Sequence, residues 1–515
     1  MQQTAYLSHS SLPDNEAPHL LIRNCALLAP YESQRLRYNQ DILIVGNRIQ
    51  AVGPSGTLEY NPFRIDRILA GDGRLVVPGL VNAHTHSLEN LLHATSPSLP
   101  LELWLVPLFS TNAEWSPRFV YLSALLGAIE MLKSGTTAVL DHLWTHAGIE
   151  LAYLDATMQA YSDAGIRAAV APSIEDQDLV LEEGAKRGID FPQHPFIQRF
   201  DLWPSIDQQV ATLNEFMSIW HNAENGRLRC LVGPSGIHWC SPDLLQSCRS
   251  LAEQYNTGMH LHAVETELQA TVIRQRLGQG GIAYLEKMGV LQPGTSLAHA
   301  IWLEEGDLDL LATTGTTVVH NPVSNLRLGS GRFPFIEALN RGVTVALGSD
   351  GSASNDTQNM FDVLKLTGLI HNDPNDDYKK WPRPVEILEA GTQGGAAALG
   401  LSNELSEIAP GQLADLVLLD LEARPFVPLR DAYLHLVYCE NGGSVDSVIV
   451  NGNVVVEHGA LTAIDEQAIR DEIREHCNML WPGFSAQLDD EANTREVLAR
   501  LDTLRRLVLN RTDDA

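Results

Sequence analysis

The stretch VVPGLVNAHTH, residues 76–86, has the pattern of an apolar β-strand that leads into two histidines, His84 and His86. Side chains two positions apart in a strand point to the same face, so both imidazoles are expected to emerge together. Two neutral imidazoles at a strand end are a typical beginning of a transition-metal site. A pair of histidines also fits a plain surface strand, and the rest of the chain has to decide between these interpretations.

Beyond this strand, short apolar runs alternate with amphipathic helical segments. This alternation favours parallel strands with both faces of the sheet covered, and hence an α/β fold. Eight stretches fit such strands, at residues 76–83, 135–141, 167–172, 228–233, 258–262, 295–299, 316–320 and 343–349. Eight strand–helix units predict a (β/α)8 TIM barrel. A doubly wound open sheet is the alternative, but no G-x-G-x-x-G motif follows an early strand to support a nucleotide-binding version.

β-type patterns also flank the predicted barrel on both sides. Gly46-Asn47 and Asn451-Gly452 each separate two apolar runs, which indicates hairpins. Neither flanking segment is large enough to fold alone, so we expect the two to combine. The predicted parts are a small composite β-sandwich built from residues 1–75 and 406–462, a TIM barrel of residues 76–405, and a helical C-terminal extension of residues 463–515.

The connection between the third and fourth predicted strands, residues 175–204, is long for a βα loop. Its Phe-Pro, His-Pro and Trp-Pro pairs fit a lid over the barrel mouth or, equally, a disordered surface insertion.

The charge of the chain restricts its partners. With 35 basic and 64 acidic residues, the formal net charge is −29. This field repels phosphate backbones and anionic membranes, so we expect neither nucleic acid nor a membrane as a partner, and a neutral or cationic small substrate is mildly favoured. The six cysteines form no CxxC pair, which fits a reducing compartment. Without a signal-peptide pattern or a run long enough to span a bilayer, the expected location is cytoplasmic.

In a TIM barrel the active site is built at the C-terminal ends of the strands. Histidines or acids follow several of the predicted strands: His84 and His86, His142, His260 and His262 with Glu265, His299, His320, and Asp350. Convergence of several imidazoles and a carboxylate at one end of the barrel predicts a metal site.

On the fifth strand, His260 and His262 share a face. His262 lies nearer the C-terminal end and is the expected ligand, whereas His260 is expected to be packed or hydrogen-bonded in the core. Glu265 lies past the strand end and could reach a metal-bound water, although an acid in a helix's first turn also fits the helix dipole.

His299 fits either a fourth nitrogen ligand or a hydrogen-bonding partner of water and substrate. Asp350 can bind a metal with one oxygen and accept a proton from water with the other; a turn or N-cap aspartate is the plainer interpretation. His320 and His142 are more typical of structural or supporting histidines than of substrate contacts.

Six stretches together resemble the amidohydrolase superfamily, in the branch of S-adenosylhomocysteine, guanine and 8-oxoguanine deaminases and triazine hydrolases. They are PGLVNAHTH (78–86), HLHAVE (260–265), LAHAIWL (297–303), HNPVSNLRLGSG (320–331), LGSDGSASND (347–356) and ADLVLLD (414–420). The resemblance implies that one divalent metal is bound by four residues, His84, His86, His262 and Asp350. It further implies that Glu265 shuttles protons, that His299 hydrogen-bonds the nucleophilic water or the substrate, and that the protein is a homodimer.

Two departures narrow this expectation. In the two-metal members of the superfamily that the sequence resembles, a lysine on the fourth strand bridges the two metal ions. Residues 228–233 of this chain contain no lysine. This absence favours a single metal, and deamination over cyclic-amide hydrolysis. In the S-adenosylhomocysteine deaminases that the sequence resembles, a Gly-Pro-His motif follows that strand. Here Gly233-Pro234 is followed by Ser235, and His238 lies three residues further on. This departure weakens the expectation of an adenosine-type substrate.

The predicted substrate contacts are Glu89, Trp104, His238 and Arg327, with Trp239 as a further candidate for the pocket lining. A solvated loop charge for Arg327, and packing for the tryptophans, are the plainer alternatives.

The predicted activity is metal-dependent deamination of an N-heteroaromatic small molecule of purine, pterin, pyrimidine or triazine type. Zn²⁺, or alternatively Fe²⁺, supplies hydroxide that attacks a ring carbon, and ammonia leaves. Displacement of chloride or alkylamine from a triazine is an alternative at the same site. Cyclic-amide hydrolysis and a catalytically inactive scaffold are weaker alternatives.

Overall fold

The computed structural model describes residues 17–28, 36–109, 115–145, 149–199, 203–375, 377–488 and 491–511; side chains are described in these ranges except at Phe63 and residues 479–492.

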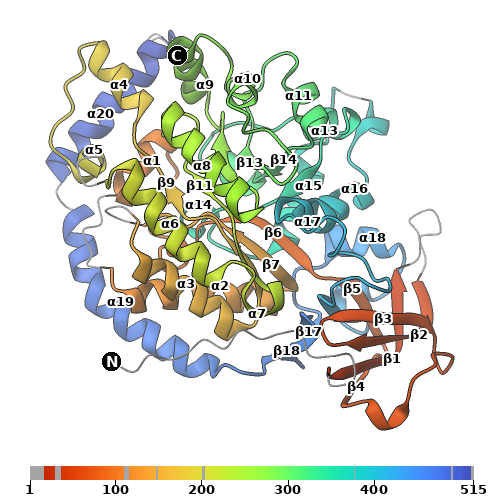
Figure 1. The fold of residues 1–515 in the computed structure, drawn as a ribbon. Coiled ribbons are helices and arrows are strands. Elements are labelled where there is room, and N and C mark those ends of the chain that lie inside the picture. Colours follow the sequence, from red (N-terminus) through yellow and green to blue (C-terminus); the bar gives the residue numbers. More distant parts are fainter. Residues whose placement is uncertain are drawn as a thin grey trace.

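Parallel strands form the centre of the molecule, surrounded by helices (Figure 1). They lie in two four-stranded sheets, in the orders β10-β8-β7-β6 and β12-β13-β14-β15. The strands are β6 (Leu80–Thr85), β7 (Thr136–Asp141), β8 (Arg167–Val170), β10 (Leu228–Cys230), β12 (His260–Ala263), β13 (Ser296–His299), β14 (Thr317–His320) and β15 (Val345–Leu347). Each overlaps one of the predicted stretches, and the pairing within both sheets is parallel, which confirms the α/β pattern.

Backbone contacts join the two sheets at both edges. On one side, β9 (Ser173–Ile174) pairs with β11 (Gly233–Pro234), and a bridge connects Gly236 to His262 on β12. On the other side, the amide of Asp350 donates to the carbonyl of His84 at 2.9 Å. Within the described residues the ladders remain separate sheets, so closure of a complete barrel is not established by the strand pairing alone.

Helices occupy the connections between the strands. The longer ones are α2 (Pro117–Lys133), α3 (Leu151–Ala164), α6 (Ile206–Trp220), α8 (Pro242–Tyr255), α9 (Glu267–Leu277), α11 (Asp307–Thr314) and α15 (Met360–Ile370). Several begin at a serine or threonine N-cap, as α8 does, where Ser241 accepts a hydrogen bond from the amide of Leu244.

The first predicted strand, residues 76–83, is divided between two sheets. β5 (Arg74–Pro78) pairs with β16 (Leu416–Asp420) in a peripheral sheet, and β6 begins at Leu80 beside β7. The chain crosses between them at Gly79, where an added Cβ would lie 2.0 Å from the hydroxyl of Thr137. Glycine suits this crossing, because any side chain at residue 79 would overlap the side chain of Thr137.

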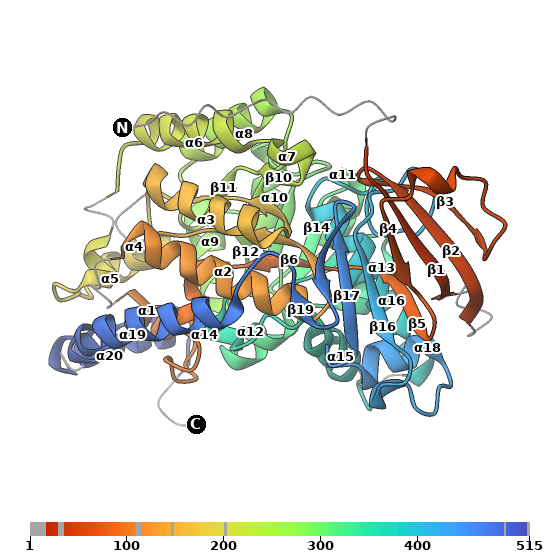
Figure 2. The same ribbon diagram turned by 90° about the horizontal axis from the view of Figure 1, so that it is seen from below.

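The peripheral sheet combines both ends of the chain (Figure 2). It has nine strands, in the order β19-β18-β17-β16-β5-β1-β2-β3, with β4 beside β1. The strands not yet introduced are β1 (His19–Leu28), β2 (Leu36–Val45), β3 (Arg48–Pro54), β4 (Arg67–Ala70), β17 (Val445–Val450), β18 (Asn453–Glu457) and β19 (Ala460–Leu461). Both predicted hairpins are confirmed, by the β2–β3 and β17–β18 pairs. The hydrogen-bonded strands form one sheet; the second layer of a sandwich stays a prediction.

The C-terminal segment forms two long helices, α19 (Glu466–Leu488) and α20 (Glu491–Val508). They run along the outside of the molecule, past α2 and α1 (Leu101–Phe109) (Figures 1 and 2). Along α20, Val497, Leu501 and Leu504 are buried. Leu504 reaches α4 (Leu179–Lys186), where an added Cβ on Gly184 would lie 3.3 Å from it.

The long connection after β9 contains α4 and the short helix α5 (Pro195–Gln198), whose Phe196 is buried. Residues 200–202 of this connection lie outside the described residues. Among the described helices, none combines the length and apolarity that a bilayer crossing requires.

Candidate active site

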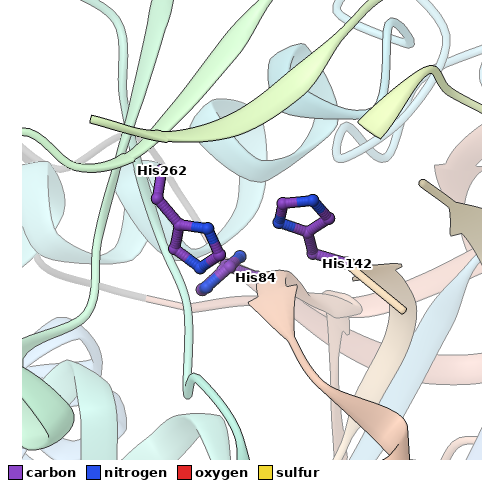
Figure 3. A group of neighbouring side chains, drawn as sticks. All are labelled: His84, His142 and His262. Carbon is purple, nitrogen blue, oxygen red and sulfur yellow. The ribbon is translucent and has the colours of Figure 1, made fainter. Parts of the chain in front are cut away.

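The imidazoles and the carboxylate predicted at the strand ends converge. Figure 3 shows the rings of His84, His142 and His262 directed toward one another from the ends of β6, β7 and β12. Nε2 of His84 and Nε2 of His86 both lie 3.4 Å from Oδ1 of Asp350. Nε2 of His299 lies 3.8 Å from Oδ2 of the same carboxylate. Asp350 is therefore the common partner of imidazoles from two sheets.

Four of these imidazoles are held in the same way, with Nδ1 bonded to a neighbour and Nε2 left for the centre of the cluster. The four contacts are His84 Nδ1 with His260 Nε2 (2.8 Å), His86 Nδ1 with the His142 carbonyl (2.7 Å), His262 Nδ1 with the Ser235 carbonyl (2.6 Å) and His299 Nδ1 with Asn325 Oδ1 (2.8 Å). An acceptor at Nδ1 fixes the tautomer whose Nε2 carries a lone pair, which is how metal-binding histidines are oriented.

The cluster fits a divalent metal ion. Nε2 of His84 is fully buried and, among the described residues, has no hydrogen-bond partner, an arrangement that is costly unless a ligand completes it. Imidazole nitrogens and a carboxylate oxygen are donors suited to zinc or iron. Two groups have donor atoms within 4.8 Å of one another: His84, His142 and His262, and His84, His299 and Asp350. His142, expected from the sequence to be a supporting residue, therefore also lies near the candidate donors.

Burial and charge set the protonation of the cluster. Burial lowers the pKa of His84 to about 4, so its imidazole is neutral and able to donate a lone pair. Burial opposes ionisation of Asp350, but the imidazoles of His84, His299 and His86 outweigh it and hold the pKa of the carboxyl well below its usual range. The site thus combines a neutral imidazole with an ionised carboxylate, as metal binding requires.

Glu265 follows β12 and lies beside this cluster. Its Oε1 accepts a hydrogen bond from the Ser330 hydroxyl at 3.0 Å, and its Oε2 lies 3.7 Å from Nε2 of His299. Burial raises the pKa of Glu265 to about 7, although the charge of His299 opposes the shift. A carboxyl group that titrates near neutral pH can both accept and donate a proton.

His260 and His320 do not line the cavity described below. Nε2 of His260 contacts His84 and its Nδ1 lies 2.7 Å from the Ser296 hydroxyl, which confirms the expected hydrogen-bonded core position. The Nε2 atoms of His320 and His371 are 3.1 Å apart, and the His320 ring also packs against Phe333.

A cavity opens above the histidine cluster and encloses about 760 Å³, solvent at its mouth included. His86, His262, His299, Glu265 and Asp350 form its floor. Its walls are rich in tryptophan: Trp104, Trp144, Trp203 and Trp239 all line it. Aromatic walls around a polar floor are suited to a flat heteroaromatic ligand.

Of the predicted substrate contacts, Glu89 and Trp104 line this cavity, as does Trp239. Both oxygens of Glu89 already accept hydrogen bonds inside the protein, from Trp144 Nε1 at 3.1 Å and from the amide of Ala353 at 3.2 Å.

His238 and Arg327 are not brought into the lining that the described residues form. The ring of His238 packs against Trp239, with 4.1 Å between the ring centroids. The guanidinium of Arg327 forms an ion pair with Asp356 and donates to the carbonyl of Ser96 at 3.1 Å. Its charge is thus compensated by the loop after β15, and substrate contact by Arg327 has no support from its position.

The sequence interpretation missed several lining residues, which are Trp144, Ser173, Glu175, Arg199, Trp203 and Ser235. Glu175 follows β9 directly, so the rule applied to the other strand ends could have found it. The third predicted strand stops at residue 172, before β9 begins. Trp203 belongs to the Trp-Pro pair that fitted a lid over the barrel mouth, whereas no local pattern gave a signal for Arg199 in the same connection.

The family model for the amidohydrolase family matches residues 75–455. The chain belongs to this family. It is 33% identical over 432 residues to a 5'-deoxyadenosine deaminase of Methanothermobacter thermautotrophicus, a match that covers 83% of this chain and 92% of the relative. It is 34% identical over 437 residues to a 5-methylthioadenosine/S-adenosylhomocysteine deaminase of Nitratidesulfovibrio vulgaris, covering 84% and 91%.

Among solved structures, the atrazine chlorohydrolase of Arthrobacter aurescens TC1 complexed with zinc superposes with a TM-score of 0.79 and 28% sequence identity, covering 88% of this chain and 99% of that one. The comparisons confirm the resemblance that the motifs indicated, including its deaminase and triazine-hydrolase branch. The protein is an amidohydrolase-family hydrolase.

Proposed function

We propose that the protein is a metal-dependent aminohydrolase that replaces an amino group on an N-heteroaromatic ring by a water-derived oxygen and releases ammonia. The observation that carries this proposal is the floor of the cavity. Imidazoles with fixed Nδ1 contacts surround the ionised carboxylate of Asp350, and Glu265 lies next to them under aromatic walls.

In this proposal one divalent metal is held by four residues: His84, His86, His262 and Asp350. Zinc is favoured over iron because solved structures of similar proteins contain zinc and because the donors are imidazole and carboxylate. When bound, such an ion lowers the pKa of water toward about 7.

The chain's own residues then move the protons. The free carboxylate oxygen of Asp350 accepts a proton from the attacking water. Glu265, whose pKa is raised to about 7, delivers its proton to a ring nitrogen and regains one from the hydroxyl group of the adduct, while the proton on Asp350 passes to the departing amino group. His299, held by Asn325 and directed at both carboxylates, hydrogen-bonds the water or the substrate. The ring carbon gains oxygen and loses nitrogen, so the amine and water give a carbonyl product and ammonia.

A second candidate is displacement of chloride or alkylamine from a triazine at the same site. The similarity to an atrazine chlorohydrolase supports it. Cyclic-amide hydrolysis through a lysine-bridged metal pair has less support, because the segment Leu228–Pro234 that forms β10 and β11 contains no lysine.

Metal analysis and a substrate panel test the proposal. We expect about one zinc or iron per chain, and ammonia release from at least one aminated purine, pterin, pyrimidine or triazine. Chloride or alkylamine release without ammonia would select the second candidate. Absence of metal after purification and reconstitution would contradict both.

The remaining expectations belong to the same proposal. They are closure of the parallel strands into a (β/α)8 barrel, residues 1–75 and 406–462 as one composite β-sandwich domain, residues 463–515 as an extension, a homodimer, and a cytoplasmic location. Light scattering on the purified protein measures the oligomeric state directly.

A further inference from the structure

One wall of the cavity is built where β9 and β11 end. The parallel register pairs Ser173 with Gly233 and Ile174 with Pro234, so the next residues along the two strands, Glu175 and Ser235, are neighbours. The amide of Ser235 donates to the carbonyl of Ile174 at 2.8 Å, which extends this register past the strands. Both Glu175 and Ser235 line the cavity, beside the ligand candidate His262.

Among the described residues of this wall, Arg199 lies close to two carboxylates, those of Asp178 and Glu175. The guanidinium of Arg199 donates to Asp178 at 2.8 Å and to the carbonyl of Phe196 at 2.6 Å, and it lies over the ring of Phe196. Its Nε is 3.6 Å from Oε1 of Glu175, beyond a direct hydrogen bond. Asp178 is therefore the close partner of Arg199. Two carboxylates face one guanidinium, and Glu175 is the carboxylate that lines the cavity.

Glu175 differs from the other carboxylates of the described lining. Both oxygens of Glu89 are engaged by Trp144 and the amide of Ala353. Asp350 and Glu265 belong to the histidine cluster at the floor. Glu175 is more than nine-tenths buried, and burial raises its pKa to about 7 although the charge of Arg199 and polar interactions with the side chains of Ser235 and Arg199 oppose the shift. A buried carboxyl group on the cavity wall is costly unless a polar partner meets it there.

The ligand chemistry follows from the shape of a carboxyl group. A carboxylate meets a protonated aminoazine, and a carboxylic acid meets a neutral one, through the same two parallel hydrogen bonds, one to the exocyclic amino group and one to the adjacent ring nitrogen. The tryptophans around the cavity, Trp104 and Trp239 among them, would hold such a ring by its faces.

We propose that Glu175 determines substrate specificity by binding a second amino group and its neighbouring ring nitrogen, on the edge of the heteroaromatic ring away from the carbon that reacts. The substrate class is accordingly a diamino-substituted azine, such as a diaminopyrimidine or diaminopteridine. This inference rests on the proposed aminohydrolase function, since it concerns the substrate of that same site.

Matched substrate pairs test the inference: 2,4-diaminopyrimidine against 4-aminopyrimidine, and 2,4-diaminopteridine against 4-aminopteridine. We expect the wild-type enzyme to favour the diamino member of each pair at least tenfold in kcat/KM, chiefly through KM. Glu175→Leu should remove this preference and keep the metal content. Glu175→Gln should retain most of it, because an amide offers one acceptor and one donor to the same edge.

Asp178→Asn is the matched control, because it weakens the close partner of Arg199 without changing a residue of the described cavity lining. We expect this variant to keep the preference. Loss of preference in Asp178→Asn as large as in Glu175→Leu would overturn the inference in favour of positioning by Arg199. A wild-type enzyme without preference, or an unchanged preference in Glu175→Leu, would overturn it as well.

Calorimetry separates failure of this inference from failure of the proposed function. In the Glu265→Gln background, where proton delivery is removed, 2,4-diaminopyrimidine should bind at least tenfold more tightly than 4-aminopyrimidine, and Glu175→Leu should abolish the difference. If this binding pattern holds and no amine of the panel releases ammonia, the aminohydrolase proposal fails and the specificity of the wall stands. Equal binding of the two compounds would overturn the inference whatever the activity.

Discussion

The floor and the wall of the cavity are built in different ways. The floor consists of side chains at or just beyond the C-terminal ends of parallel strands, such as His86, His262 and Asp350, each within a short sequence motif. The wall consists of residues from the connection after β9, such as Arg199, and of helix α1 with Trp104. Short motifs at strand ends are enough to predict the residues of the floor, whereas several residues of the wall come from connections and helices without such motifs.

This difference matters for function as well as for folding. The floor carries the groups that fit a metal, and these side chains stand in the short motifs by which the sequence resembles the family. The wall carries charged and aromatic side chains. We therefore expect substitutions in the floor to abolish activity, and substitutions in the wall to change which substrate is used and how stable the fold is.

The largest expected effect separates the alternative donor sets of the floor. His86→Ala should lose the metal and essentially all activity, because the proposed ligand set includes Nε2 of His86, 3.4 Å from Asp350. His142→Asn should keep the metal, since only the backbone carbonyl of His142 is needed to orient His86. Metal content after dialysis checks both variants. Retention in His86→Ala together with loss in His142→Asn would assign the metal to the group containing His142.

Glu265→Gln tests proton transfer in the floor without removing a proposed ligand. We expect retained metal and a decrease of kcat by about 10²–10⁴-fold, because the amide cannot deliver a proton to the ring or the leaving group. Steady-state ammonia release measures the effect, with circular dichroism and metal content as controls for folding. Activity equal to the wild type would exclude the shuttle role.

The floor was largely predictable from the sequence because its physical causes are local. The i, i+2 spacing of His84 and His86 determines a common face, and the strand end places Asp350 at the same rim. Gly79 shows where the same approach fails: β5 and β6 are both apolar, so nothing in their composition reveals that the chain changes sheets between them.

Trp104 and Trp239 of the wall were predicted, but other contacts of the wall were missed for a related reason. Arg327 stands in a family motif, yet its charge is taken by Asp356, a pairing that depends on two loops meeting in space. Glu175 was not considered because the predicted third strand ended too early, and the role of α20 depends on contacts with α1 and α4 that no short stretch encodes.

Helix α20 provides the next prediction, which concerns the support of the wall. Leu504 is fully buried against α4, whereas Leu507 on the same helix is 49% exposed. Leu504→Ala should lower the free energy of unfolding by about 2–5 kcal/mol and raise KM, because a cavity forms behind the wall. Leu507→Ala is the matched control and should change stability by less than about 0.5 kcal/mol. Equal effects of the two substitutions in thermal or urea unfolding would show that α20 does not support the wall.

A last prediction concerns the pH dependence of stability that Glu175 confers on the wall. Because burial raises the pKa of Glu175 from 4.5 to about 7, the folded protein holds a proton that the unfolded chain has already lost between these values. The stabilisation is complete below pH 4.5 and is lost as the pH rises through about 7, by about 1.4 kcal/mol for each pH unit in this window. Glu175→Gln has no such proton, so its unfolding midpoint in urea should fall less between pH 5 and pH 7.5 than that of the wild type. Parallel curves for the two proteins would mean that Glu175 is ionised throughout this range and forms a fixed ion pair with Arg199.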